Sequence, residues 1–365
     1  MQKIILIVLM VMFFTPASFA SQDVKYAGFA FVGNAKDISV NFKYSSQINA
    51  MKDEQGRSIF DREVQKFFKD NASTMPGVNI LMGEDSKTKL AVALALTREN
   101  ISVVNIDDVY KVVVSLSCNV TFLDFDGMKV AATYPIYLEY IDVQQNQPDE
   151  DYKINLVKKL YFSDDFSILK ILKERWRKIG LKNEAILTMK LLNVNLEDEA
   201  KDKLTVYKDN FGAFESLLAQ RFSDALSSKL NVSVLPYAKD YLGGRMSLVF
   251  SDARMQDFQI PTSSYGIDLT LRKLTKEFYK EGVGDNAFLY GAYTTVKIYD
   301  PDLGKIYWEQ KVKYGAVKNI PKLQKTTDDY SVFDEMTGLV VGEIIKTIKE
   351  DKPLYKEVIS RCLNK

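Results

Sequence analysis

The sequence predicts an α+β protein of two similar units, each a mostly antiparallel or mixed sheet with a long hairpin and helices packed on one face. Two observations predict this. Strand-like and helix-like segments follow one another in the same order twice, and the chain is rich in residues typical of strands and filled cores, with 20 Tyr and 21 Phe. The two runs meet near Gly180, so we expect a signal peptide over 1–20, a first unit over 21–180 and a second over 181–365.

The first unit begins with an apolar strand, continues with an amphipathic helix and a short strand, and ends with a hairpin and a second helix. Apolar residues that recur on one helical face identify the helices, and alternation around a turn containing Asp and Gly identifies the hairpin. In chain order we expect a strand at 26–32, a helix at 60–69, a strand at 78–82, hairpin strands at 110–123 and 128–141, and a helix around 168–179.

The second unit repeats that order with different residues. A charged connector follows its first strand, and its hairpin turns on an Asp-Pro-Asp-Leu-Gly segment. We expect a strand at 185–194, a helix at 211–230, a strand at 232–236, hairpin strands at 287–299 and 305–314, and a helix around 339–348. The repeated order favours a duplication or two related domains.

The hairpin strands show which face is buried, because successive side chains on a strand point to opposite faces. In the second hairpin, Ile306, Trp308 and Val312 are expected to face the core. In the first hairpin, one face is apolar and carries Val112, Val114, Leu116, Cys118, Val120 and Phe122. The opposite face carries Val113 and the polar residues Lys111, Ser115, Ser117, Asn119 and Thr121.

The N-terminus has the three parts of a secretory signal. Lys3 is followed by an unbroken apolar run over 4–14, and small residues follow, with Ser18 and Ala20 at the −3 and −1 positions. The apolar run is shorter than the ~20 residues that a membrane-spanning helix needs. We therefore expect cleavage after Ala20, a soluble mature chain without a transmembrane segment, and a periplasmic or secreted location.

Charge and composition argue against several kinds of chemistry. The chain has 49 basic and 48 acidic residues, so it lacks the basic excess typical of proteins that bind nucleic acid or anionic lipid. It has no histidine, which removes Ser-His-Asp and Cys-His catalysis and nearly all zinc sites. We therefore expect no cofactor and no metal.

Cys118 and Cys362 are the only cysteines. In an oxidising compartment they could form a disulfide that ties the C-terminal tail to the first unit. The alternative is that Cys118, on an apolar strand face, is a buried thiol that packs as a small hydrophobic residue. There is no Cys-x-x-Cys, so the sequence gives little support for a redox role.

The acidic residues leave a second functional class open. The turns at 124–127 and 300–304 begin like calcium loops but lack the later acidic ligand, so they are interpreted as hairpin turns. A pair of carboxylates could still act as a hydrolase of envelope polymers or sugars, but the sequence singles out no pair. A small ligand could also bind between the two units.

The second hairpin, Tyr-Asp-Pro-Asp-Leu-Gly-Lys-Ile-Tyr-Trp over 299–308, together with the order of elements, resembles a group of periplasmic envelope domains. That group includes the amino-terminal domain of the Tol-system translocation protein and the curli-secretion lipoprotein family. The chain lacks the lipid-anchor Cys of the curli family, which puts a pore-forming role in doubt. The resemblance implies a non-catalytic periplasmic protein that binds another envelope protein during envelope or appendage assembly.

Overall fold

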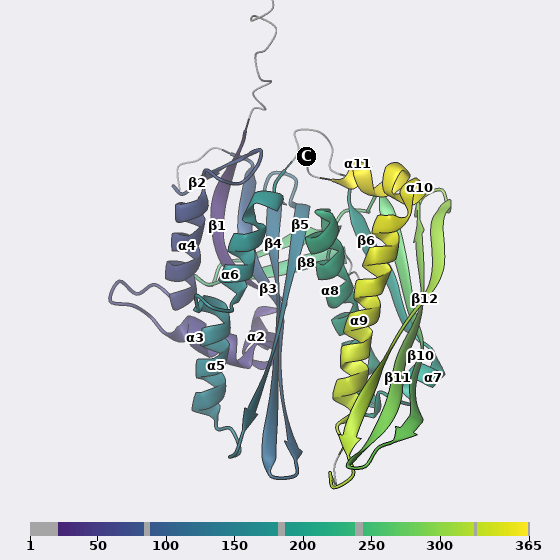
Figure 1. Ribbon diagram of the computed structural model, residues 1–365. Helices are drawn as coiled ribbons and strands as arrows, with labels where there is room; N and C mark the ends of the chain where they lie inside the picture. The colour runs from purple at the N-terminus through teal and green to yellow at the C-terminus, as the bar shows by residue number, and fades with distance from the viewer. Residues whose placement is uncertain (1–20, 84–87, 182–186, 238–243, 325–326, 364–365) are drawn as a thin grey trace, which may run out of the picture.

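The computed structural model describes residues 21–83, 88–181, 187–237, 244–324 and 327–363. Their helices and strands form four layers, in the order helices, sheet, helices, sheet (Figure 1). The signal peptide expected over 1–20 lies outside the described residues. Within the described ranges, no helix is both long and apolar enough to cross a membrane.

The first sheet has the core order β2-β1-β3-β4-β5, in which β1 is parallel to β2 and β3 and the remaining pairs are antiparallel. One face is covered by helices from the same half of the chain (Figure 1). The strands are β1 (Gln22–Val32), β2 (Val78–Leu81), β3 (Leu90–Ile106), β4 (Val109–Asp124) and β5 (Lys129–Gln144). The helices are α2 (Ile38–Asn41), α3 (Lys43–Ala50), α4 (Ile59–Asn71), α5 (Glu150–Phe162) and α6 (Ile168–Arg175).

The second sheet repeats this topology. Its order is β7-β6-β10-β11-β12, and β6 is parallel to β7 and β10 while the other pairs are antiparallel. The strands are β6 (Met189–Leu196), β7 (Val234–Leu235), β10 (Tyr265–Glu281), β11 (Asp285–Tyr299) and β12 (Ile306–Pro321). The helices are α7 (Asp198–Lys201), α8 (Phe211–Leu230), α9 (Asp329–Glu350), α10 (Lys352–Leu354) and α11 (Ser360–Cys362). The predicted α+β fold of two similar units is confirmed.

The repeat extends to irregularities within the strands. In both hairpins, the register shifts close to the turn, between Phe122 and Leu123 and between Ile298 and Tyr299. In both central strands it shifts again near the middle, after Leu96 in β3 and after Leu271 in β10. A β-bulge disrupts the ladder locally, so its recurrence at equivalent places supports duplication more strongly than element order does.

The strands β3 and β10 were not predicted, although each forms the centre of its sheet. Residues 91–96 of β3 are all buried, because helices cover one face and other elements cover the second. A strand buried on both faces is continuously apolar and lacks the alternation that reveals a half-buried strand. The segment therefore cannot be distinguished by its pattern from a buried helix.

A hairpin from the second half of the chain closes the first sheet. The strands β8 (Arg245–Phe250) and β9 (Met255–Gln259) pair with each other, β8 also pairs with β1, and β9 meets β5 at one residue pair. Strands β1, β3, β4, β5, β9 and β8 thus form a closed ring with a small apolar core of its own, which includes Phe250 and Phe258. The division at residue 180 stays a prediction, and this hairpin crosses it.

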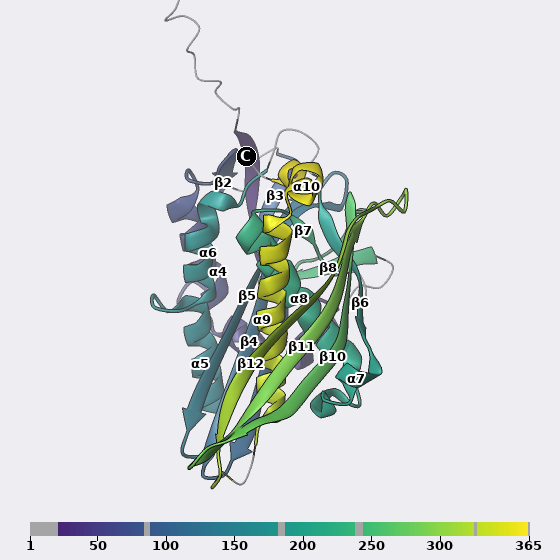
Figure 2. The same cartoon turned by 45° about the vertical axis from the view of Figure 1, so that its right-hand side comes forward.

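Helices α8 and α9 form the third layer, between the sheets. Turning the second sheet toward the viewer shows them behind its strands (Figure 2), and both contribute to its core. Side-chain oxygens cap both helices at their N-termini: Asn210 accepts from the Ala213 N–H and Asp328 from the Ser331 N–H. Helix α8 ends at Asn231 in the left-handed conformation (φ 56°).

The predicted apolar faces of the hairpins are confirmed except at Ile306, which is 53% exposed. The bulge at Tyr307 turns Ile306 to the face opposite Trp308. All six apolar-face residues of β4 are fully buried, and Trp308 of β12 is 5% exposed. The polar face of β4 is also buried, because elements of the second half pack against it: Ser115, Ser117, Asn119 and Thr121 are at most 4% exposed. The polar pattern therefore indicates an interface between the two halves.

Candidate functional site

The outer edge of β5 is covered by the second half of the chain. The Thr133 N–H donates to Ser233 Oγ (3.1 Å), and the Tyr137 N–H donates to Asp224 Oδ1 (3.1 Å). Arg175 donates to the Pro135 carbonyl oxygen (2.6 Å). An edge strand normally exposes these backbone groups as a template for further strand pairing. Here α8 and the segment before β7, together with Arg175 at the end of α6, satisfy them.

A buried arginine joins the two halves at the same strand. Arg221 of α8 is 8% exposed and donates to Glu139 of β5 and to both carboxylate oxygens of Asp334 in α9, the latter at 2.6 Å. Its guanidinium also lies over the Tyr137 ring, 5.3 Å from the centroid. Nearby, burial raises the pKa of Asp224, although its ion pair with Arg175 opposes that rise.

The strand β12 is the counterpart of β5, but its outer edge is open. The matching bulges align Thr133, Pro135 and Tyr137 with Glu309, Lys311 and Lys313. These three residues are exposed, and within the described ranges no other element hydrogen-bonds to their backbone and neither lysine has an ion-pair partner. The edge strand is long, running from Ile306 to Pro321. It offers unpaired N–H and C=O groups flanked by positive charge.

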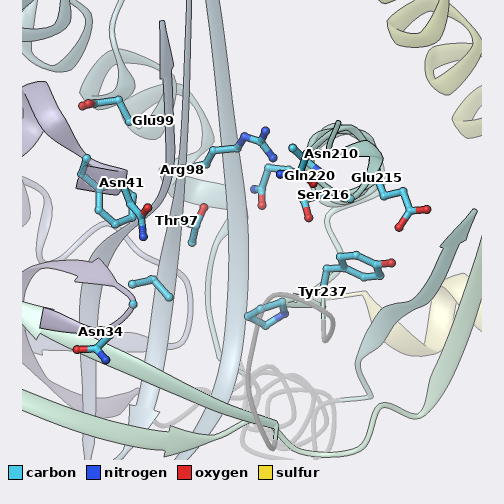
Figure 3. A pocket seen from close by; sticks show the side chains of 16 residues that line it. Asn34, Asn41, Thr97, Arg98, Glu99, Asn210, Glu215, Ser216, Gln220 and Tyr237 are labelled. Carbon is cyan, nitrogen blue, oxygen red and sulfur yellow. Dashed lines mark hydrogen bonds between the residues drawn. The ribbon is translucent and has the colours of Figure 1, made fainter. Parts of the chain in front are cut away.

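A cavity of about 750 Å³ lies between the two halves at the end of α8 nearest Asn210. The bulge in β3 shapes one wall. Because Thr97 is the extra residue, Arg98 is moved off the helix-covered face and lies opposite Ser117. Figure 3 shows Arg98 reaching from β3 toward α8, where Asn210 and Gln220 lie.

The next residue, Glu99, points away from Arg98 (Figure 3) and stabilises the N-terminus of helix α3. Its carboxylate accepts from the backbone N–H groups of Tyr44 and Ser45, each at 2.8 Å, and from the Ser45 hydroxyl. Helix α3 has no cap from its own N-cap residue, Phe42, so Glu99 supplies one from a neighbouring strand. Burial raises the pKa of Glu99, and the three hydrogen bonds oppose the rise.

Several polar atoms at this interface are buried without a hydrogen-bond partner among the described residues. On β4 they belong to alternate residues of the face that carries Arg98, and on α8 to the cavity-lining Gln220. They are Ser117 Oγ, Asn119 Oδ1, Thr121 Oγ1 and Gln220 Nε2. Leaving such a group unsatisfied costs about 1–3 kcal/mol, so each requires an explanation.

The structure does not bring the predicted cysteine pair together. Cys118 and Cys362 are both thiols, and they are buried in different cores, the first under the helices of the first sheet and the second beside the second sheet. Burial raises the pKa of Cys118. Its position matches the alternative expectation, a buried thiol that packs as a small hydrophobic residue.

The other chemical expectations concern carboxylates. The turns at 124–127 and 300–304 are hairpin turns, closed by bonds such as Gly127 N–H to Asp124 Oδ1 (2.9 Å). Among the described residues, no group of three or more His, Cys, Asp or Glu side chains could hold a metal. Glu99 and Glu215 both line the cavity but point in opposite directions (Figure 3), so they do not form the facing pair that a hydrolase requires.

No protein-family model and no curated protein matches the chain. A homolog of the neuraminyllactose-binding hemagglutinin from Helicobacter pylori is similar over 49% of this chain and 92% of its own, at 11% identity and a TM-score of 0.30. A minor lipoprotein from Acinetobacter baumannii is similar over 47% and 97%, at 10% identity and a TM-score of 0.22. A lipoprotein from Caulobacter crescentus CB15 is similar over 38% and 82%, at 9% identity and a TM-score of 0.21.

Proposed function

We propose that this chain is an exported, non-enzymatic accessory protein of the cell envelope that binds another envelope protein at the outer edge of β12. The observation that carries the proposal is the contrast between two equivalent strands. The β5 edge is satisfied by Ser233, Asp224 and Arg175, whereas no described element occupies the same edge of β12. An open edge of this length can accept one more strand, the binding mode called β-augmentation.

The side chains along β12 restrict the partner. Lys311 and Lys313 lie on the outer face beside the open edge, and Lys305 lies near its beginning, 4.4 Å from the centroid of the Tyr307 ring. Lysines on an edge strand disfavour pairing with an uncharged apolar strand. A strand that carries Asp or Glu opposite them would gain from cross-strand charge pairs. The expected partner segment is therefore extended and acidic.

The test is site-specific crosslinking in the native envelope. A photoreactive residue at Lys311 should capture one protein, and mass spectrometry should locate the link in an acidic extended segment. The same residue at Lys66, exposed on α4, is the control and should not capture that segment. The substitutions Lys311→Glu and Lys313→Glu should abolish capture by a photoreactive residue placed at Glu309. Equal capture from position 66, or after charge reversal, would refute the proposal.

The proposed location rests on the N-terminal sequence and has its own test. If the signal is cleaved after Ala20, the mature protein in a periplasmic extract begins at Ser21. Intact-mass measurement of the extracted protein would show this. A mass that retains residues 1–20 would refute the expected cleavage while leaving the β12 proposal open to its own experiment.

A further inference from the structure

We infer that the cavity between the two halves is a binding site for a small organic anion that carries hydroxyl groups. This inference is independent of the proposed β12 interaction, because the cavity lies at the N-terminal end of α8 and β12 does not line it. Its volume, about 750 Å³, is within the range of pockets that enclose small molecules. Interfaces between domains are a common place for such pockets.

Arg98 supplies the charge recognition. It lines the cavity and is partly buried, and its guanidinium makes no ion pair or hydrogen bond with any described residue. A guanidinium presents several N–H donors in a plane and can bind a carboxylate or phosphate through two parallel hydrogen bonds. The β3 bulge gives Arg98 this position, because an unbroken ladder would turn residue 98 toward the apolar core beneath the helices.

The facing wall adds to the positive field. Gly212 and Ala213, in the first turn of the 20-residue helix α8, line the cavity, and that turn contains no acidic residue. The N-terminus of a helix is the positive end of its dipole and favours anions. Of the two acidic residues in the lining, Glu99 is engaged with α3, and Glu215 points away from Arg98 (Figure 3).

A buried polar atom without a partner indicates that the ligand also carries hydroxyl groups. Gln220 lines the cavity beside Arg98, and its buried Nε2 is a donor without an acceptor (Figure 3). A purely apolar ligand would leave this donor unsatisfied, whereas a hydroxyl group would accept a hydrogen bond from it. Acidic sugars and hydroxy acids have this combination.

Binding is tested by calorimetric titration of the mature protein with glucuronate, citrate and inorganic phosphate, with glucose as the uncharged control. Glucuronate or citrate should bind with a Kd of about 1 mM or lower, and glucose should not. Binding of phosphate as well would identify the anion site without the hydroxyl requirement and would overturn that part of the inference. The absence of binding for all three anions would overturn the whole inference.

Three variants locate the site. Arg98→Gln should weaken binding at least about tenfold, roughly the contribution of one charge-assisted hydrogen bond, and Arg98→Lys should weaken it less. Gln220→Leu should weaken the binding of glucuronate. If phosphate binds, its affinity should be the same for this variant as for the native protein. The matched control is Arg272→Gln, an arginine at the equivalent bulge of β10 that does not line the cavity. Circular dichroism confirms folding of each variant, and unchanged binding by folded Arg98→Gln would refute the site.

Discussion

The two sheets have one topology but different surroundings. The first is enclosed: its own helices cover one face, and the β8–β9 hairpin and α8 cover the other, so that the polar residues of β4 are buried. The second has helices on one face only, and the opposite face of β12 is exposed. The difference teaches that one half acts as the partner of the other. The second half covers the first, and no described element covers the second in the same way.

The interface between the halves combines an apolar core with buried polar contacts. The apolar core lies under the β8–β9 hairpin. Elsewhere the contacts include hydrogen bonds and ion pairs, such as Arg175 with Asp224 (2.8 Å) and Lys111 with Asp328 (3.0 Å). Interfaces between domains of one chain are commonly of this polar kind. A few buried charges hold the two halves in register at this interface. A single substitution there should therefore have the largest effect on the free energy of unfolding.

The largest expected effect is from Arg221→Ala. Removing the guanidinium leaves Glu139 and Asp334 without their buried cation, which should lower the free energy of unfolding by about 3–5 kcal/mol. Urea denaturation of the mature protein measures this. Lys346→Ala is the control, because it breaks an exposed pair with Glu343 and should give no measurable change. Similar results for the two variants would show that the buried network does not hold the halves together.

A matched pair of proline substitutions tests the two edges directly. Thr133→Pro removes an N–H that donates to Ser233 and should cost about 3 kcal/mol or more. Glu309→Pro, at the equivalent position of β12, removes an N–H that faces solvent and should cost about 1 kcal/mol or less. Pro135, two residues beyond Thr133 on the same edge of β5, shows that an outward-facing position of this strand accepts proline. Equal costs, measured by urea denaturation, would mean that the β12 edge is not open.

Much of the fold could be predicted, because the hairpins and amphipathic helices have strong local patterns. Helix α8 begins and ends where its apolar stripe predicts, at Phe211 and Leu230. The sequence left open a ligand between the two units, but the role of Arg98 there could not be predicted, because Arg98 faces the cavity only as a result of a bulge that no residue type marks. The same holds for β5 and β12: Thr133 and Glu309 are both ordinary strand residues, and only the packing of the segment before β7 against β5 makes these two positions different.

The two halves also differ at the residue after the bulged segment. The first has Glu99, which caps α3, and the second has the buried Leu274. Burial raises the folded-state pKa of Glu99 above its ordinary value of 4.5, so its contribution to stability is full below that pH and is lost as pH rises through the folded-state pKa. Relative to Glu99→Gln, the native protein should therefore lose stability as pH rises above 4.5. Urea denaturation at several pH values measures the difference, and a difference independent of pH would contradict the expected shift.

The smallest expected effect on stability is from Lys311→Glu combined with Lys313→Glu. Both side chains are exposed and have no ion-pair partner among the described residues, so the free energy of unfolding should change by less than about 0.5 kcal/mol. A control with the same charge change is Lys66→Glu combined with Lys356→Glu, at exposed helical positions. If the β12 pair lowers stability by more than about 1 kcal/mol, those lysines contribute to the fold of the second half. Loss of partner capture could then no longer be assigned to the edge itself. If stability is unchanged and capture is lost, the open edge of the second sheet has a role that the enclosed first sheet cannot share.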